Sequence, residues 1–358
     1  MKIRSFNKRI VHHTILKDQG GTAMVANLLN QGLQALGAGS SVQSEVVPSR
    51  KNDPAVVKFV PEKDVFYHIH STRDWAGTLK SLESAGVTPV ITMHDASILT
   101  GGCIYPLECV EWVKGCCNCL RGYTDSESIL KQKKENLLAI DPILVSPSRW
   151  LADMSEKAFP GLRIRVVPNG IMVRANVDAN VRHLSDFKGK LVLFVAHGGT
   201  KAGYKSGSRW IEIWNEIKQK EPQSRALFIG SEKSDQLKDV FQLPYLPNNT
   251  LRTIMQYADV LVYPSLADNH PLVVLEAMMS RLPVVAFAVG GIPEQVESGK
   301  TGMLVRPGDL KSLSKAAVTL LRDRLQAKNL SDRAFQLATQ KFSSEKMVEG
   351  YLKIYDEF

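Results

Sequence analysis

Two runs of alternating strand-like and helix-like segments, separated by one stretch with neither pattern, constrain the fold of this 358-residue chain most strongly. Strands of parallel sheets read as short apolar runs, whereas helices repeat apolar residues every three or four positions. The strand-like segments of the first run are residues 9–15, 64–70, 88–95 and 141–148. Those of the second run are residues 191–198, 225–231, 259–265, 283–291 and 302–309. Residues 172–190 between the runs are typical of a linker.

This alternation predicts two α/β domains of the Rossmann type, each with a parallel sheet, and a cleft between the domains. Ligands of such sheets bind beyond the carboxyl ends of the strands, so the residues there are candidates for ligand contact. Glycines among them would let the backbone approach a phosphate, although glycines also simply make tight turns. These candidates are Gly20, Gly21, His70, His94, Asp95, Ser148, Gly198, Gly199, Ser231, residues 265–276, Gly290 and Gly291.

The composition narrows the class of protein. Hydrophobic residues make up 44% of the chain, and the apolar runs are far shorter than the ~20 residues that span a bilayer. The first residues lack the apolar stretch of a signal peptide, so we expect a cytoplasmic protein. The net charge of +9 is spread along the chain, whereas a nucleic-acid binder would concentrate it in a stripe. Diffuse positive charge suits anionic small molecules or the inner face of a membrane.

Residues 263–309, which begin YPSLADNHPLVVLEAMMS, resemble the C-terminal signature of the retaining glycosyltransferases of family 4. That family carries two acids followed by a Glu-Ala-Met sequence, an apolar strand and a Gly-Gly turn. Segments of the first half agree with the family in the same order, at residues 20–37, 91–102, 145–154 and 166–171. The resemblance covers nearly the whole chain, and the cysteine cluster after residue 102 is similar to enzymes that build bacterial surface polysaccharides.

The resemblance implies the GT-B fold, an α/β fold in which two Rossmann-like domains turn their parallel sheets toward a central cleft. Residues 1–180 would form the acceptor-binding domain and residues 188–338 the domain that binds a nucleotide-sugar donor. Residues 339–358 would form a helix that crosses back to the N-terminal domain. Apolar residues recur in this helix at helical spacing and need a surface to cover. They are Met347, Tyr351, Ile354 and Tyr355.

Two acids, Asp268 and Glu276, stand at the centre of the matching segment. The resemblance implies that Glu276 binds the ribose hydroxyls of the nucleotide and that Asp268, where the family usually has Glu, lies beside the donor sugar. The loop between them would offer backbone N–H groups to the donor through Asn269, His270, Pro271 and Leu272. A second interpretation needs no ligand: Asp268 or Asn269 caps a helix, Pro271 lies in its first turn, and Glu276 points into solvent.

The resemblance also implies a basic group against the donor diphosphate, and Lys205 matches it better than the rival Lys201. A fixed ammonium stabilises the charge that builds on a departing diphosphate. Gly20, Gly21 and Gly199 would likewise approach the donor. His94, at the end of a strand, would face the donor sugar across the cleft. The reaction would substitute on one face of the sugar, with the departing phosphate taking the acceptor proton and no metal required.

All five cysteines lie within residues 103–119. Cys103, Cys109, Cys116 and Cys119 have the spacing C-x5-C-x6-C-x2-C, whose closing C-x2-C favours a structural zinc, although reduced buried thiols are the alternative. A further basic cluster lies on a predicted helix, at Lys131, Lys133 and Lys134. It is either a solvated helix face or a contact with anionic lipid head groups near a lipid-linked acceptor.

The sequence therefore predicts an enzyme that moves a sugar from a UDP- or GDP-sugar to a glycan or lipid-linked acceptor. A catalytically degenerate module that only binds a nucleotide sugar or glycan is the alternative. It is favoured by three departures from the family, at Asp268, Met172 and Arg281, where the family often has Glu, Asp and Gly. A dinucleotide-dependent oxidoreductase is disfavoured, because no G-x-G-x-x-G follows the first strand.

Overall fold

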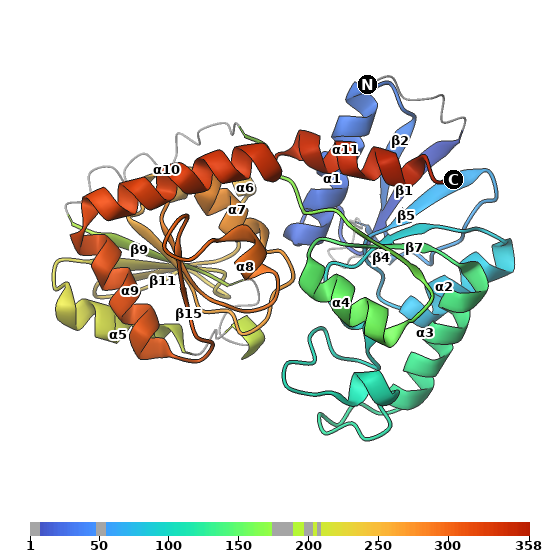
Figure 1. The fold of residues 1–358 in the computed structure, drawn as a ribbon, viewed down its shortest axis with the longest axis horizontal. Helices are drawn as coiled ribbons and strands as arrows, with labels where there is room; N and C mark the ends of the chain where they lie inside the picture. Colours follow the sequence, from blue (N-terminus) through green and yellow to red (C-terminus); the bar gives the residue numbers. More distant parts are fainter. Residues whose placement is uncertain (1–7, 48–54, 174–188, 197–202, 206–208) are drawn as a thin grey trace. The chain divides into compact units, whose positions relative to one another are not determined.

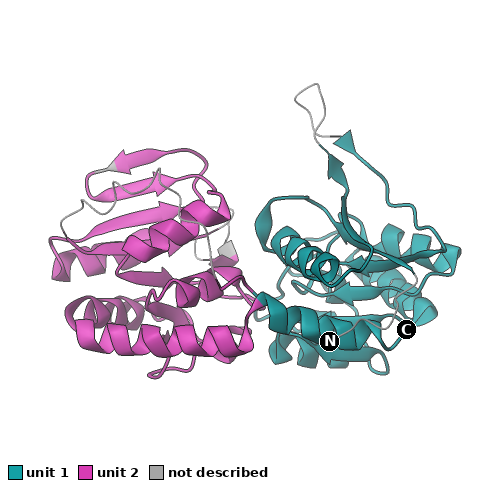
Figure 2. Ribbon diagram, turned by 90° about the horizontal axis from the view of Figure 1, so that it is seen from above, with its two compact units in different colours: residues 1–170, 344–358 teal, residues 171–343 magenta. Residues whose placement is uncertain are grey.

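A computed structural model describes residues 8–47, 55–173, 189–196, 203–205 and 209–358 (Figure 1). The chain forms two compact units, coloured separately in Figure 2. Unit 1 comprises Met1–Gly170 together with Ser344–Phe358, and unit 2 comprises Ile171–Ser343. The first unit ends before the expected boundary at residue 180. The segment that returns to unit 1 begins at Ser344 and not at the expected residue 339. The reason is that helix α10 (Arg324–Lys341) packs on α7 (Leu272–Met279) and therefore still belongs to unit 2.

Unit 1 is built on a six-stranded sheet in which every paired strand runs parallel. Its strand order is β2 (Ser40–Ser44), β1 (Arg9–Thr14), β5 (Val65–Ile69), β6 (Val90–Thr92), β7 (Ile143–Ser146) and β8 (Arg163–Val166). A two-stranded antiparallel ribbon, β3 (Val46–Val47) with β4 (Ala55–Val56), stands apart from it. The helices are α1 (Gly20–Ala35), α2 (Trp75–Ala85), α3 (Ser126–Ile140) and α4 (Arg149–Ala158). Ser148 caps α4, since its side chain accepts a hydrogen bond from the Leu151 N–H.

The last helix, α11 (Ser344–Tyr355), packs against α1 and covers one face of this sheet. Tyr351 and Tyr355 are fully buried there, and their hydroxyls reach Thr92 and His68 at 2.7 Å. The Phe66 ring meets the Tyr355 ring edge-on, with 5.4 Å between the ring centroids. Unit 1 is therefore completed by a helix that follows unit 2 in the sequence, as Figure 2 shows by colour.

Unit 2 is built on a seven-stranded sheet that is parallel except for its edge strand β11 (Asp235–Leu237). From that edge the order continues through β12 (Val240–Leu243), β10 (Arg225–Ile229), β9 (Leu191–Val195), β13 (Val260–Tyr263), β14 (Val284–Phe287) and β15 (Met303–Val305). Because β10 and β13 lie on opposite sides of β9, the winding of the chain reverses at this point. Ligands of open α/β sheets bind at such a switch point.

Helices α5 (Trp210–Lys220) and α9 (Leu310–Arg322) pack together over one face of the sheet. There Trp210 stacks on Phe228, with 4.7 Å between the ring centroids, within a cluster of buried apolar side chains. Helix α7 packs against α6 (Asn248–Tyr257), α10 and the short α8 (Ile292–Gln295). The expected α/β fold with two Rossmann-like parallel sheets is confirmed. No helix in the described ranges is long and apolar enough to cross a membrane.

We expect Tyr351→Ala to lower the free energy of unfolding by about 3–5 kcal/mol, as the loss of a large buried ring does. Urea unfolding of the variant and the wild type would measure the change. Lys353→Ala, at an exposed position of the same helix, is the matched control and should change the value by less than about 0.5 kcal/mol. Equal stability of both variants would contradict the packing of α11 on unit 1.

Candidate functional site

In unit 2, Lys205 and Asp268 meet beyond the carboxyl ends of β9 and β13. Lys205 closes the short helix η5 (Gly203–Lys205), and its Nζ lies 3.8 Å from Asp268 Oδ2. The Tyr263 hydroxyl, at the end of β13, donates to the same carboxylate oxygen at 2.6 Å. Both charged side chains remain partly exposed, at 18% and 13%. An ammonium and a carboxylate are thus held, still accessible to solvent, at the topological switch point of the sheet.

Backbone contacts fix the loop that carries Asp268. The Leu266 N–H donates to the Tyr204 carbonyl at 2.6 Å, which ties the loop to the segment that bears Lys205. The Gly291 N–H donates to the Asp268 carbonyl at 3.1 Å. Gly290 has φ +56°, and a Cβ there would overlap that carbonyl oxygen. The Gly-Gly turn therefore serves the close approach of two loops.

Glu276 lies in α7 and is buried, with 4% of its surface exposed. The Asn248 side-chain amide donates to its Oε1, and both Asn248 and the buried Arg252 belong to α6. Burial raises the pKa of Glu276 to about 7, although the Arg252 charge and the Asn248 hydrogen bond act to lower it. Arg252 is itself anchored by donating to the Met172 carbonyl at 2.9 Å. The fold therefore keeps the Glu276 carboxyl group out of water, although desolvation disfavours its charged form.

The interpretation of this segment as a solvated, capped helix is wrong. Helix α7 begins at Leu272, its N-cap position is Pro271, and no side chain caps it. The Asp268 carboxylate is engaged by Tyr263 and Lys205 instead, and Glu276 is buried. Asn269 and His270 are buried beside the helix start, where the Gln295 amide lies 3.0 Å from His270 Nδ1. Gln295 also donates to the Pro271 carbonyl, so α8 fixes the entry to α7.

In unit 1, Gly20 and Gly21 form the N-terminus of α1, and Gly20 has φ +84°. His94 follows β6, and although the residue as a whole is half-buried, desolvation of its imidazole lowers the pKa to about 3, so the ring is neutral. Gly198, Gly199 and Lys201 lie outside the described residues. The described candidates therefore fall into two groups, one on each unit: Gly20, Gly21 and His94 on unit 1, and Lys205, Asp268 to Leu272 and Glu276 on unit 2.

A row of buried histidines leads to His94, and sequence reasoning did not find it. His12 Nδ1 lies 3.1 Å from His70 Nε2, and His70 Nδ1 lies 3.1 Å from His94 Nε2. His12 and His68 are direct neighbours across β1 and β5, so their side chains share one face of the sheet. The sequence feature that could have indicated this row is the spacing of two histidines in the segment DVFYHIH. It places His68 and His70 on the same face of a strand.

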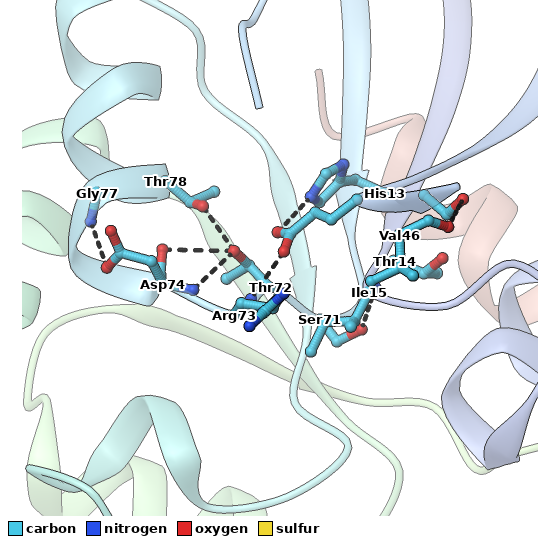
Figure 3. Close-up of polar contacts among 12 residues, drawn as sticks. His13, Thr14, Ile15, Val46, Ser71, Thr72, Arg73, Asp74, Gly77 and Thr78 are labelled. Carbon is cyan, nitrogen blue, oxygen red and sulfur yellow. Dashed lines mark hydrogen bonds and ion pairs between the residues drawn. The ribbon is translucent and has the colours of Figure 1, made fainter. Parts of the chain in front are cut away.

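The opposite side of β1 carries a second polar group, which was also missed. The buried Glu45 accepts from His13 Nε2 at 3.0 Å and from the Arg73 N–H at 3.1 Å. Burial alone would raise the pKa of Glu45, but hydrogen bonds from His13, Thr72 and Arg73 outweigh it and lower the pKa. Figure 3 shows how Thr72 continues this network to Thr78 and Asp74, which caps α2. The loop after β5 is thereby pinned at the carboxyl edge of the sheet.

Three histidines could in principle hold a metal ion. Among the residues that the structure describes, His12, His68 and His70 form the group whose ligand atoms all lie within 4.8 Å of one another. However, both ring nitrogens of His68 contact hydroxyls at 2.7 Å, those of Tyr355 and Thr92. Both nitrogens of His70 contact other histidines. Hydrogen bonding thus accounts for the arrangement without a metal.

The cysteines lie in the long segment between η1 (Ser97–Leu99) and α3, which has only the short helix η2 (Glu111–Lys114) within it. Burial raises the pKa of Cys103 and of Cys116, and charge on the other cluster cysteines would raise both further. Backbone N–H groups of Arg121 and Tyr123 lower the pKa of Cys119. The sulfurs are thus neighbours, but within the described chain they do not form a group of three within 4.8 Å. Zinc at the cysteines stays a prediction.

The three lysines of α3 do not share one environment, so the prediction that all three lie on a solvated or lipid-contacting helix face is wrong for Lys133. Lys131 and Lys134 are exposed, but Lys133 is buried and donates to the carbonyls of Ser97 and Thr100 at 2.9 Å. Burial lowers the pKa of Lys133 to about 8. Lys133 therefore anchors the segment that follows His94, because its ammonium donates to two backbone carbonyls of that segment. A membrane contact of the two exposed lysines stays an expectation.

Comparison with known proteins shows a similarity to one family over part of the chain. Residues 189–323 match the family model described as Glycosyl transferases group 1. Over this part of its length the chain is similar to the group 1 glycosyltransferases. It is 24% identical, over 99% of both chains, to WcaC of Escherichia coli K12, a glycosyl transferase named for colanic acid biosynthesis.

Two further proteins are similar to this chain, one in the sequence of a part of it and the other in its fold. Over 149 residues the chain is 30% identical to N-acetyl-alpha-D-glucosaminyl L-malate synthase of Bacillus anthracis. That match covers 42% of this chain but spans only 35% of the relative's length. The structure of HepE from Anabaena, in complex with UDP-glucose, superposes with a TM-score of 0.71 over 98% of this chain and 100% of that chain. At 16% identity this likeness shows the GT-B fold.

The burial of Glu276 predicts a pH-dependent stability. A carboxyl group whose pKa rises from 4.5 to about 7 on folding favours the protonated form in the folded state. Its unfavourable contribution is absent below about pH 4.5, grows as the pH rises to about 7, and is then constant. At ~1.36 kcal/mol per pKa unit, Glu276→Gln should gain about 3 kcal/mol over wild type across this window. Urea unfolding at several pH values measures the difference.

Glu45→Gln is the control, because hydrogen bonds lower the pKa of Glu45 and favour its charged form. Its contribution is present at neutral pH and is lost as the pH falls through the folded pKa, the opposite sign to that of Glu276. A constant difference between Glu276→Gln and wild type at every pH would contradict a titrating, buried Glu276.

The cysteine cluster allows a metal analysis with an internal control. If the four cysteines close around zinc, purified protein should carry close to one zinc per chain, and Cys116→Ser or Cys119→Ser should lose it. Cys117 is exposed and donates to the Lys114 carbonyl, and it is not one of the four predicted ligands, so Cys117→Ser should keep the zinc. Protein without zinc would show that the cysteines are reduced thiols.

Proposed function

We propose that this chain transfers a sugar from a nucleotide-diphosphate sugar to a glycan or lipid-linked saccharide, with retention of configuration at the sugar. The observation that carries the proposal is the meeting of Lys205, Asp268 and Tyr263 beyond β9 and β13. A diphosphate at this place would have a cation beside it, and a donor sugar would have a carboxylate. The UDP-glucose complex of HepE, which shares the fold, supports a nucleotide-sugar donor.

Lys205 would supply the charge that the leaving group needs. Breaking the bond between sugar and diphosphate builds negative charge on the diphosphate oxygens, and a preorganised cation stabilises that charge in the transition state. Because Asp268 holds the ammonium at 3.8 Å and the Leu266–Tyr204 hydrogen bond ties the two loops, the cation is positioned before the donor arrives. No metal ion is needed for this task in the proposal.

Glu276 would bind the ribose of the donor. A carboxylate accepts two hydroxyl hydrogen bonds, and such charge-assisted bonds are stronger than neutral ones. The pKa of about 7 means that Glu276 is partly protonated at neutral pH, and two ribose hydroxyls would favour the charged form. Donor binding would then offset the free energy that burial of the Glu276 carboxylate costs on folding.

We assign the reaction to the synthesis of a cell-surface polysaccharide, supported by the name of WcaC, which matches this chain along its whole length. Retention follows in the proposal from substitution on one face of the sugar, with the departing phosphate oxygen taking the acceptor proton. The acceptor would be held by unit 1, where the loops after β1, β5 and β6 carry polar side chains.

A binding module without turnover is the second candidate, favoured by three departures from the family. One of them has a structural account. Arg281, where the family often has Gly, adopts φ +55° after α7, pairs with Asp332 and lies 4.0 Å above the Phe335 ring. These contacts compensate for a backbone conformation that disfavours Arg, so this departure does not speak against catalysis.

We expect Glu276→Gln to weaken nucleotide-sugar binding by about 1.5–3 kcal/mol, since an amide offers one acceptor oxygen in place of a charged pair. Asp268→Asn should lower kcat more than it raises KM, because the lost contact acts mainly in the transition state. Asp268→Glu should retain activity. Steady-state transfer from UDP- and GDP-sugars and isothermal titration would measure these effects.

The control is Asp309→Asn in the same unit, which keeps the cap of α9 and should alter neither binding nor turnover. Normal turnover in both Glu276→Gln and Asp268→Asn would falsify the donor-site assignment. Tight donor binding by the wild type without transfer or hydrolysis would favour the binding module.

A further inference from the structure

Helix α6 brings a buried cation to the helix that carries Glu276. Arg252 is 3% exposed and stands one turn after Asn248 in α6, so the two side chains share one face of the helix. Asn248 donates to Glu276 Oε1, and α6 packs against α7. The guanidinium of Arg252 therefore lies on the side of α6 that faces the carboxyl group, and its charge acts on that group.

Two nitrogens of Arg252 contact the backbone of the segment that enters unit 2. Nη1 donates to the Met172 carbonyl at 2.9 Å, and Nη2 lies 3.5 Å from the Val173 carbonyl. Nε is buried and has no partner among the described residues. Burial of a cation whose hydrogen-bond partners are neutral is costly, and desolvation accordingly lowers the pKa of Arg252. An arrangement of this cost indicates a role beyond packing.

This geometry separates the charge of Arg252 from its hydrogen bonds. A direct pair of Arg and carboxylate is frequently bidentate and would occupy the oxygens that a ligand needs. Here the carbonyls of Met172 and Val173 take the Nη donors, and the positive charge still acts on Glu276. A cation placed in this way favours the charged carboxylate without using its acceptor oxygens.

We propose that Arg252 is a positioning residue for donor binding. Its buried charge favours the ionised form of Glu276 that accepts the ribose hydroxyls, while its N–H groups hold the backbone at Met172 and Val173. The assignment of Glu276 to ribose belongs to the proposed function, and this inference rests on it. The contact at residue 172 uses a backbone carbonyl, which any residue there provides, so Met172 in place of the Asp that the family often has does not disturb it.

The inference predicts how donor binding depends on pH. Burial raises the pKa of Glu276 to about 7, and the Arg252 charge opposes the rise. Helix α7 packs against α6, α8, α10 and β14, and of the charged groups described on these elements Arg252 is the one that shifts this pKa. Because ribose hydroxyls favour the charged carboxylate, donor affinity should increase as the pH rises to about 7 and then level off. Without Arg252 the increase should occur at higher pH.

Substitutions at Arg252 separate its charge from its hydrogen bonds. Arg252→Gln keeps an amide donor for a carbonyl and removes the charge, whereas Arg252→Lys keeps the charge and loses the planar pair of donors. Arg252→Met removes the charge and suits an apolar site, so it replaces Arg252→Gln if melting curves show that variant to be unfolded. Lys300→Gln is the matched control, because it removes one positive charge from an exposed position of unit 2.

The first measurement needs no ligand. Carbon-13 NMR of the full chain with labelled glutamate carboxyl groups follows their titration, and Glu276→Gln identifies the Glu276 signal. We expect a midpoint near pH 7 in the wild type. In Arg252→Gln the midpoint should be higher by about one pH unit, as loss of a neighbouring opposite charge predicts. Arg252→Lys and Lys300→Gln should keep the wild-type midpoint.

Isothermal titration with UDP between about pH 5.5 and about pH 9 adds a functional readout. At neutral pH, Arg252→Gln should bind UDP about 5-fold more weakly than the wild type, because a rise of about one pKa unit leaves roughly a tenth of Glu276 ionised instead of half. The two affinities should converge toward the alkaline end of the range. Arg252→Lys and Lys300→Gln should follow the wild type at every pH.

Two results would overturn the inference. One is a Glu276 midpoint that Arg252→Gln leaves unchanged. The other is UDP binding that Arg252→Gln weakens by the same factor at every pH, as expected if Arg252 only clamps the backbone. Absence of UDP binding by the wild type at any pH would refute the proposed function instead, whereas the NMR titration would still measure the effect of Arg252 on Glu276.

Discussion

Parallel strand pairing places the carboxyl end of every strand at the same edge of its sheet, and both groups of candidate residues depend on this constraint. In unit 2 the loops after β9 and β13 bring Lys205 to Asp268, although they are far apart in the sequence. In unit 1 the same edge brings His70 and His94 together. Hydrophobic contacts such as those of α5 and α9 stabilise the sheets. The loops at the edge contribute little to this packing and can therefore carry charged side chains.

The two units treat polar groups in different ways. Unit 2 buries a carboxyl group, Glu276, whose pKa rises to about 7, and it keeps Lys205 and Asp268 partly exposed. Unit 1 buries neutral histidines that hydrogen-bond to one another and to hydroxyls of α11. A buried ionisable group costs stability, and proteins tolerate such costs where a ligand is bound. For Glu276 in unit 2, we infer that the cost in stability is tolerated because the carboxylate binds the donor.

Local patterns in the sequence were sufficient to predict several strands and helices and the N-terminal cap of one helix. The apolar runs predicted strands β1, β5, β7 and β13, and Ser148 predicted the start of α4. The apolar residues of α11 indicated a helix that must cover a surface. These features are local, since they depend on the spacing of neighbours along the chain.

Features that depend on tertiary contacts could not be read in this way. Lys133 stands among exposed charges on α3, and only the carbonyls of Ser97 and Thr100 explain its burial. The His12–His70–His94 row requires the pairing of β1, β5 and β6, which no local pattern specifies. The pKa of Glu276 likewise depends on α6, which supplies Asn248 and Arg252.

A crystal structure of the protein with UDP would test the central claim most directly, namely that the switch point of unit 2 is a donor site. Our account predicts the diphosphate within salt-bridge distance of Lys205 and the ribose hydroxyls hydrogen-bonded to the Glu276 carboxylate. A nucleotide bound elsewhere, with Glu276 still hydrogen-bonded to Asn248 instead of to ribose, would contradict it.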